Sequence, residues 1–190
     1  MDIYQLIDDS SYKSYKLIGG TSKLITFKGQ SLINSWEELE GEVYKNFDNK
    51  GKKDGFDARV AGAFLVMEKE KATLFTRRIN VKAELLPFKF VNVKKDFVFI
   101  NIQNVIEGIN NEGVSHLKRM ELYRNKDLYF YEEASKNILF RDATSETKLF
   151  CTQELESILN ELDIKGLALE KVGKVAPIPL FPKERNIFNR

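Results

Sequence analysis

The chain has 190 residues, of which 43% are hydrophobic and 31% are charged, a composition typical of folded globular proteins that excludes a disordered chain. Its 30 lysine and arginine residues nearly balance 28 aspartate and glutamate residues, and the two signs are interleaved along the sequence. No global field therefore indicates a nucleic-acid or membrane partner. The length predicts a single domain covering residues 1–190.

Cysteine content and the N-terminal residues predict a cytoplasmic protein. The only cysteine, Cys151, excludes an internal disulfide. The start, Met1 to Gln5, has neither the basic segment nor the apolar run of a secretion signal. The longest apolar stretches, such as Phe97 to Ile100, are far shorter than the roughly 20 residues that cross a bilayer.

The N-terminal part of the chain predicts irregular strands, joined by glycine turns, followed by a helix. From Ser35 to Phe47 the spacing of apolar residues is typical of an amphipathic helix. Ser35 and Glu38 form a capping-box pattern at its start. The apolar positions of this predicted helix are Trp36, Leu39, Val43, Tyr44 and Phe47.

A loop, a strand and a helix are expected in the middle of the chain. Asp48 to Gly55 contains no apolar residue and is predicted to be an exposed loop. A short buried strand is expected at Phe64 to Met67, followed by a helix over Glu68 to Ile79. The buried face of that helix is predicted to hold Ala72, Phe75 and Ile79.

A region rich in short strands follows. Because the run Asp96 to Ile102 has apolar residues on both faces, it is predicted to be a central strand covered on both sides. Pro87 separates two of the other predicted strands. These other strands are Val81 to Leu86, Phe88 to Val93, Leu128 to Tyr131, Ile138 to Phe140 and Lys148 to Cys151.

The C-terminal segment predicts a helix, a strand and an extended tail. Thr152 is expected to cap a helix that runs to about Leu162, with a strand over Leu167 to Val172 behind it. Three prolines predict an extended tail over residues 175–190. Together the elements predict an α+β fold, a single domain with a mostly antiparallel sheet of short strands packed against a few amphipathic helices. The predicted buried stripe of the last helix is Leu155, Ile158, Leu159 and Leu162.

Residues that commonly carry catalysis are scarce. One histidine, His116, excludes metal sites and triads that need several imidazoles. Cys151 lies in a predicted strand without a nucleophile motif and is interpreted as a buried structural thiol. No glycine motif that binds phosphate is present, so no nucleotide cofactor is expected. The sequence predicts no catalytic residue, cofactor or metal, and an enzyme of unrecognised type using Cys151 and His116 is kept as an alternative.

Charged clusters are the remaining candidates for contact with a partner. The acidic residues of the first predicted helix lie mostly opposite its apolar stripe, and a solvated face is the simpler interpretation. They are nevertheless the best candidate for a partner-binding patch, because they are compact and of one sign. These residues are Glu37, Glu38, Glu40 and Glu42.

Three basic pairs lie close to acidic residues, which favours a solvated surface and leaves a nucleic-acid-binding module as a further alternative. The pairs are Lys52-Lys53, Arg77-Arg78 and Lys94-Lys95.

Several motifs in the C-terminal half stand in a familiar order. They are Glu84 to Pro87, Phe97 to Ile106, an acidic turn ending in Ser115, Ile138 to Arg141, Phe150 to Leu155, and Ile164 to Val172. Over roughly Phe64 to Val172 this order resembles the eleventh immunity-protein family of bacterial polymorphic toxin systems. The motifs contain no catalytic signature, so the resemblance implies a fold and a role and not a reaction.

The resemblance implies an immunity protein that sits in the cytoplasm and neutralises a cognate toxin protein by tight binding without turnover. Neither nucleic acid nor membrane is an expected partner. Protection of a cell needs nanomolar affinity, about 12 kcal/mol of binding free energy, across an interface on the order of 1,600 Å². The sequence pI of about 8.5 argues against a generally acidic decoy. Either the acidic cluster acts locally, or the toxin is not a strongly basic nuclease.

Overall fold

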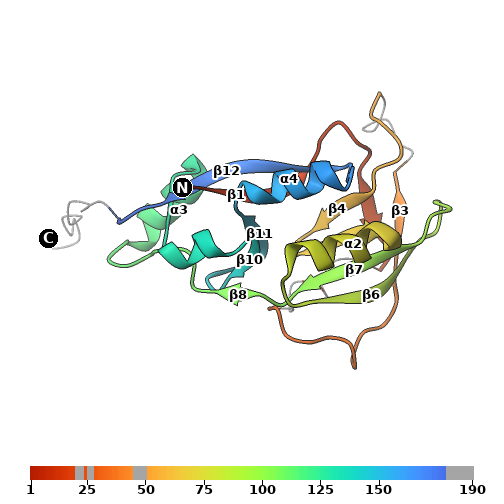
Figure 1. The fold of residues 1–190 in the computed structure, drawn as a ribbon, viewed down its shortest axis with the longest axis horizontal. Helices are drawn as coiled ribbons and strands as arrows, with labels where there is room; N and C mark the ends of the chain where they lie inside the picture. The colour runs from red at the N-terminus through yellow and green to blue at the C-terminus, as the bar shows by residue number, and fades with distance from the viewer. Residues whose placement is uncertain (20–23, 25–27, 45–50, 179–190) are drawn as a thin grey trace, which may run out of the picture.

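Two six-stranded sheets form the framework of the chain, whose computed structural model describes residues 1–19, 24, 28–44 and 51–178 (Figure 1). The strands of the first sheet are β1 (Asp2–Asp8), β8 (Val105–Ile106), β9 (Leu128–Phe130), β10 (Leu139–Asp142), β11 (Ser145–Cys151) and β12 (Leu167–Val175). Those of the second sheet are β2 (Tyr15–Leu17), β3 (Leu39–Val43), β4 (Ala58–Ala61), β5 (Phe64–Glu68), β6 (Ala83–Phe90) and β7 (Phe97–Ile102). The strand orders are β8–β10–β11–β1–β12–β9 and β2–β3–β6–β7–β5–β4.

Both sheets are mixed. Most neighbouring strands are antiparallel, but β8 and β10, β9 and β12, and β3 and β6 are parallel pairs. The predicted α+β class and the mostly antiparallel pairing are confirmed, but the strands form two mixed sheets and not the single sheet that was expected. The pairing joins distant parts of the chain, since β1 is hydrogen-bonded between β11 and β12.

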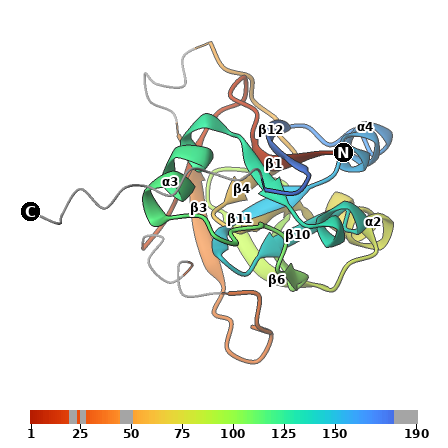
Figure 2. The same cartoon turned by 90° about the vertical axis from the view of Figure 1, so that its left-hand side faces the viewer.

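Two helices, α2 (Lys69–Ile79) and α4 (Glu154–Glu161), lie side by side on one side of the molecule (Figures 1 and 2). The predicted buried faces of both are confirmed, with Leu162 partly buried at the end of α4. The core around them takes side chains from both sheets, so the sheets belong to one domain. Its strand residues include Leu6, Leu65, Met67, Val98, Ile100, Ile102, Leu139, Leu149 and Cys151.

Each sheet has a second apolar layer on its other face. The layer on the first sheet includes Leu122 of α3 (His116–Asn125) and Ala134 of the 3₁₀ helix η2 (Glu132–Lys136). The layer on the second sheet is strongly aromatic. Its phenylalanines are Phe56, Phe64, Phe88, Phe90, Phe97 and Phe99. All six residues of β7 are buried, which confirms the predicted central strand covered on both sides.

A buried arginine connects the two sheets. Arg141 of β10 is only 1% exposed. Its Nε donates to the Ile102 carbonyl at 2.6 Å, and its Nη2 donates to Asn101 Oδ1 at 3.0 Å, both on β7. The guanidinium also lies over the Phe64 ring, 4.9 Å from the centroid. Burial lowers the pKa of Arg141 to about 10, so the side chain still carries its charge at neutral pH.

The predicted helix over residues 35–47 is wrong. Leu39 to Val43 is strand β3, and residues 45–47 lie outside the described part of the chain. The alternation of side chains explains the strand, because Leu39 and Val43 pack against the aromatic layer while the glutamates between them point the other way. Gly41 fits this position closely, since a Cβ there would lie 2.7 Å from an atom of the Phe88 ring.

Other boundaries also differ from expectation. Pro87 does not divide two strands but lies inside β6, where its carbonyl accepts a hydrogen bond from Trp36 Nε1 at 2.9 Å. The N and O of a strand residue point to the same side, so the missing N–H faces Trp36 and costs no bond to β7. Helix α4 has Gln153 and not Thr152 as its N-cap, without a side-chain cap. Of the predicted tail, residues 179–190 lie outside the described part, as do residues 48–50 of the predicted loop.

Candidate binding groove

A groove lies beside α2 on the second sheet. The helix packs over β5 and β7, while the outward residues of the neighbouring strand β6 remain open to solvent. Leu85 is 37% exposed, whereas Leu86 and Phe88 on the opposite face are buried. The cavity here has a volume of about 540 Å³. We call it the α2–β6 groove; it is lined by Lys69 and Thr73 of α2, by Leu85, Pro87 and Lys89 of β6, and by Glu38, with residues 93–98 completing it.

The two flanks of α2 differ in what they contact. On one flank, Arg78 Nη2 lies 3.2 Å from Glu161 Oε2 of α4. On the other flank, Lys69 and Thr73 line the groove, and Thr73 Oγ1 donates back to the Lys69 carbonyl at 3.1 Å. One side of the helix is therefore occupied by a helix of the same chain, and the other side opens onto the sheet.

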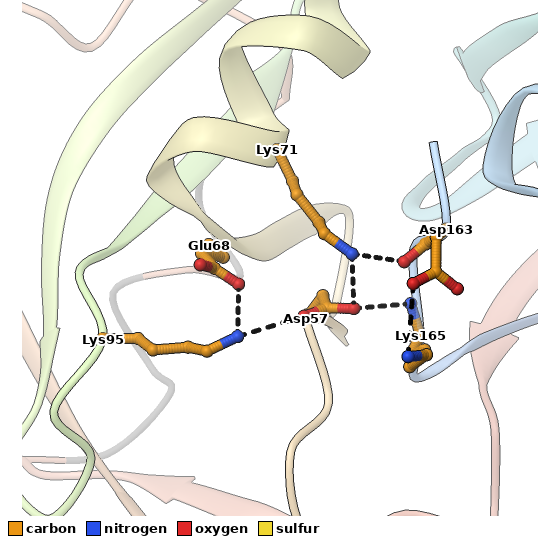
Figure 3. A network of polar contacts seen from close by, with 6 residues as sticks. All are labelled: Asp57, Glu68, Lys71, Lys95, Asp163 and Lys165. Atoms are coloured by element: carbon orange, nitrogen blue, oxygen red, sulfur yellow. Dashed lines mark hydrogen bonds and ion pairs between the residues drawn. The ribbon is translucent and has the colours of Figure 1, made fainter. Parts of the chain in front are cut away.

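A buried carboxylate fixes the start of α2 (Figure 3). Asp57 is 4% exposed, and its Oδ2 accepts hydrogen bonds from Lys71 Nζ at 2.8 Å and from the Lys165 N–H at 3.1 Å. Its Oδ1 accepts from Lys95 Nζ at 3.4 Å, and the same Nζ lies 2.7 Å from Glu68 Oε2. These contacts connect the residue before β4, the end of β5, the first turn of α2, the turn before β7 and the segment before β12, so they fix the wall of the groove to the rest of the fold.

Electrostatics within this cluster favour the charged forms. Burial by itself raises the pKa of Asp57, but the hydrogen bonds from Lys71 and the Lys165 N–H, together with the charges of Lys71 and Lys95, outweigh it and lower the pKa. The hydrogen bond to Glu68 raises the pKa of Lys95. The charge of Lys95 is thus paired with carboxylates of the same chain, although Lys95 also lines the groove.

Other lysine side chains around the groove have no partner among the described residues. The side chains of Lys69, Lys89 and Lys94 are exposed and form no hydrogen bond or ion pair with that part of the chain. Lys69 and Lys94 come from α2 and from the adjoining turn, which are connected by the Lys69 N–H donating to the Asp96 carbonyl at 2.9 Å. This side of the groove therefore carries two unpaired lysines beside one exposed carboxylate, that of Asp96.

The acidic residues singled out from the sequence lie along the other side, on a strand and not on a helix. Glu38 lines the groove directly, and Glu40 lies on β3 in register with Lys89 of β6. Glu42 is 3.2 Å from Lys16 Nζ of β2. Glu37 is exposed in the segment before β3. The expected one-signed patch is thus interleaved with lysines that the sequence pattern did not place beside it.

The single cysteine and the single histidine are not brought together in either of the hollows described around the β6–β7 turn. Cys151 is 0% exposed in the core, and His116 is exposed at the start of α3. Neither lines the α2–β6 groove or the second hollow, which lies near Phe56 and Asn92. Across the described residues, no group of three or more histidine, cysteine or acidic side chains is arranged to hold a metal ion.

Cys151 is expected to resist thiol reagents in the native protein. Burial raises the pKa of its thiol, so both the reactive thiolate and access to it are suppressed. Mixing with a chromogenic disulfide reagent should show slow labelling in buffer and rapid, stoichiometric labelling in denaturant. Labelling in buffer as fast as that of a small free thiol would contradict the buried position.

Comparison with known proteins gives no assignment. No family model matches the chain, and no curated protein matches it. Among the described residues, no helix has the length and apolar character needed to span a bilayer.

Proposed function

We propose that this protein is an immunity protein that neutralises a cognate bacterial toxin in the cytoplasm by tight binding without turnover. The observation that carries the proposal is the α2–β6 groove, where exposed apolar side chains lie between charges that the described chain leaves uncompensated. A rigid surface of this kind is suited to a protein partner, since anchor residues that dock into preformed pockets contribute most of the energy of an interface. The resemblance of roughly residues 64–172 to the eleventh immunity family is the reason that a toxin is proposed as the partner.

The ionisable side chains buried in the core support the same proposal. Asp57 and Arg141 are engaged in contacts that hold elements together, and the thiol of Cys151 is protonated and inaccessible. In two of the basic pairs, one residue forms an ion pair within the chain: Arg78 contacts Glu161, and Lys95 contacts Glu68. This weakens the alternative of a phosphate-binding surface built on those pairs.

Co-expression with the protein encoded immediately upstream, as the candidate toxin, tests the proposal. The toxin alone should stop growth, and the toxin with this protein should not. With purified components, inhibition of the toxin should be complete at an equimolar amount, and calorimetry should give a nanomolar dissociation constant, about 12 kcal/mol.

Stoichiometry distinguishes this role from catalysis. Protection by far less than one molecule of this protein per toxin would contradict binding without turnover. Rescue of growth without a detectable complex would do the same. An exposed-site variant, Arg124→Glu on α3, provides a control for changes in charge that leave the groove intact.

A further inference from the structure

We infer that the α2–β6 groove receives an amphipathic helix of the partner, with acidic residues along one flank of its apolar stripe and basic residues along the other. The inference rests on the proposed function and specifies which surface of this chain binds and what chemistry it recognises. It is carried by the width of the uncovered strip, by the apolar side chains on its floor and by the opposite charges on its two sides.

The part of the second sheet that α2 leaves uncovered, strands β6 and β3, is about as wide as a helix. Neighbouring strands lie about 4.8 Å apart, and a helix with its side chains is about 10 Å across, so one helix covers roughly two strands. Helix α2 covers β5 and β7, and the next two strands in the sheet are β6 and β3. A second helix laid parallel to α2 would cover these two. Helix α4 already packs against the other flank of α2, so the partner would complete a layer of three helices.

The floor offers apolar surface for such a helix. Leu85 is 37% exposed, and Pro87 is exposed beside it on the same face of β6. Thr73 on the wall is short, and its hydroxyl is already satisfied by the Lys69 carbonyl, so it presents a methyl group without demanding a polar partner. Apolar side chains at helical spacing on the partner would bury these groups.

The two sides of the groove carry opposite charge. Lys69 and Lys94 stand on the side of α2, where they outnumber the one carboxylate, Asp96, and Glu38 and Glu40 stand on the side of β3. Lys89 lies between them on β6. A partner helix of one sign would be attracted by one side and repelled by the other, whereas a helix with acidic and basic flanks satisfies both. The same arrangement fixes the direction in which that helix lies.

Charge reversal of each side tests the inference with the purified toxin. Lys69→Glu combined with Lys94→Glu should weaken binding by about 100-fold, because like charges then face each other across the interface. Glu38→Lys combined with Glu40→Lys should weaken it to a similar degree. The matched control is Lys82→Glu, an exposed lysine seven residues before Lys89 and therefore about 23 Å away along the strand. It should change the dissociation constant less than threefold.

All variants should keep the thermal unfolding temperature of the parent within a few degrees, since the side chains of Lys69, Lys94 and Glu38 form no hydrogen bond or ion pair with the described residues, and the backbone bonds of Lys69 survive the substitution. Glu40→Lys places like charges opposite Lys89, at a cost of no more than about 1 kcal/mol. If either reversal binds like the Lys82→Glu control, the two-sided groove is overturned while the proposed function stands. If the unmodified protein does not bind the toxin, both fail.

Cross-linking identifies the occupant directly. Because Cys151 is buried, a photoactivatable maleimide on a Thr73→Cys variant should react at that position alone. The toxin segment captured on illumination should have apolar residues at a helical period, with acidic residues on one flank and basic residues on the other. Capture of a segment without that pattern, or of none in a complex that forms normally, would overturn the inference.

Discussion

Replacing Arg141 with alanine is expected to lower the free energy of unfolding by about 4 kcal/mol. The guanidinium is buried between the two sheets and donates to the Ile102 carbonyl and to Asn101 Oδ1. Removing it leaves both acceptors without this donor in the core and opens a cavity beside Phe64. Urea unfolding monitored by far-ultraviolet circular dichroism should show a lower midpoint with an unchanged slope.

Two further substitutions separate the causes of this loss. Arg141→Met refills most of the volume without restoring the donors, so it should recover part of the stability but not all of it. Arg124→Ala, at an exposed position on α3, should change stability by less than about 0.5 kcal/mol. A loss below about 1 kcal/mol for Arg141→Ala would show that Arg141 does not bridge the sheets as described.

Removal of the Asp57 carboxylate is expected to cost about 3 kcal/mol. In an Asp57→Ala variant, Lys71 and the Lys165 N–H lose a buried acceptor that also draws Lys95 to the same site. The exposed pair Lys13 and Asp54, whose carboxylate side chain is 78% exposed, provides the matched control. Asp54→Ala should cost less than about 1 kcal/mol, because exposed ion pairs contribute little. Equal losses in the two variants would rule out a special role for the buried carboxylate.

The Asp57 cluster should also make stability depend on acidity. The folded-state pKa of Asp57 lies below its unfolded value of about 3.9, so its contribution is complete above that value and disappears as pH falls through the folded pKa. Asp57→Asn lacks the titrating group. The stability difference between the parent and this variant should therefore be constant near neutral pH and shrink below about pH 4. A difference that does not change with acidity would contradict the lowered pKa.

Local patterns in the sequence predicted the elements whose side chains face one core. Helix α2 was predicted to within one residue because Ala72, Phe75 and Ile79 recur at the period of a helix and contact the same layer. Strand β7 was predicted as a covered central strand because both of its faces are apolar. In these segments local preference and tertiary packing agree, so the spacing of the apolar residues is sufficient to predict the type of element.

The errors occur where two periods compete. Leu39 and Val43 are four residues apart, which suits one face of a helix and equally one face of a strand. Gly41 between them was the signal that could have decided, because glycine in the middle of a helix costs about 1 kcal/mol relative to alanine. Helix α3 was missed because its sequence shows no apolar period. Of its ten residues only Leu122 is buried, so no apolar stripe identifies it, although Ser115 caps it by accepting from the Lys118 N–H at 3.2 Å.

The candidate groove could not be predicted, because it depends on contacts between distant segments. Glu40 lies beside Lys89 only because β3 pairs with β6, and α2 takes its place over β5 and β7 through the packing of Phe75 and its neighbours. The sequence identified Glu38 and Glu40 as candidate contact residues. It placed them on a helix, and it could not place Lys69 and Lys94 across from them.

The position of β1 has a consequence for the order of assembly during synthesis. This strand is made before the other strands that the structure describes, yet its two neighbours are residues 145–151 and 167–175. Strands β2 to β7, by contrast, all lie within residues 15–102 and find their partners among one another. The second sheet can therefore form on the nascent chain, while both edges of β1 stay unpaired until residues 145–175 have been made. Of the strands that the structure describes, the one made first is thus among the last to be paired.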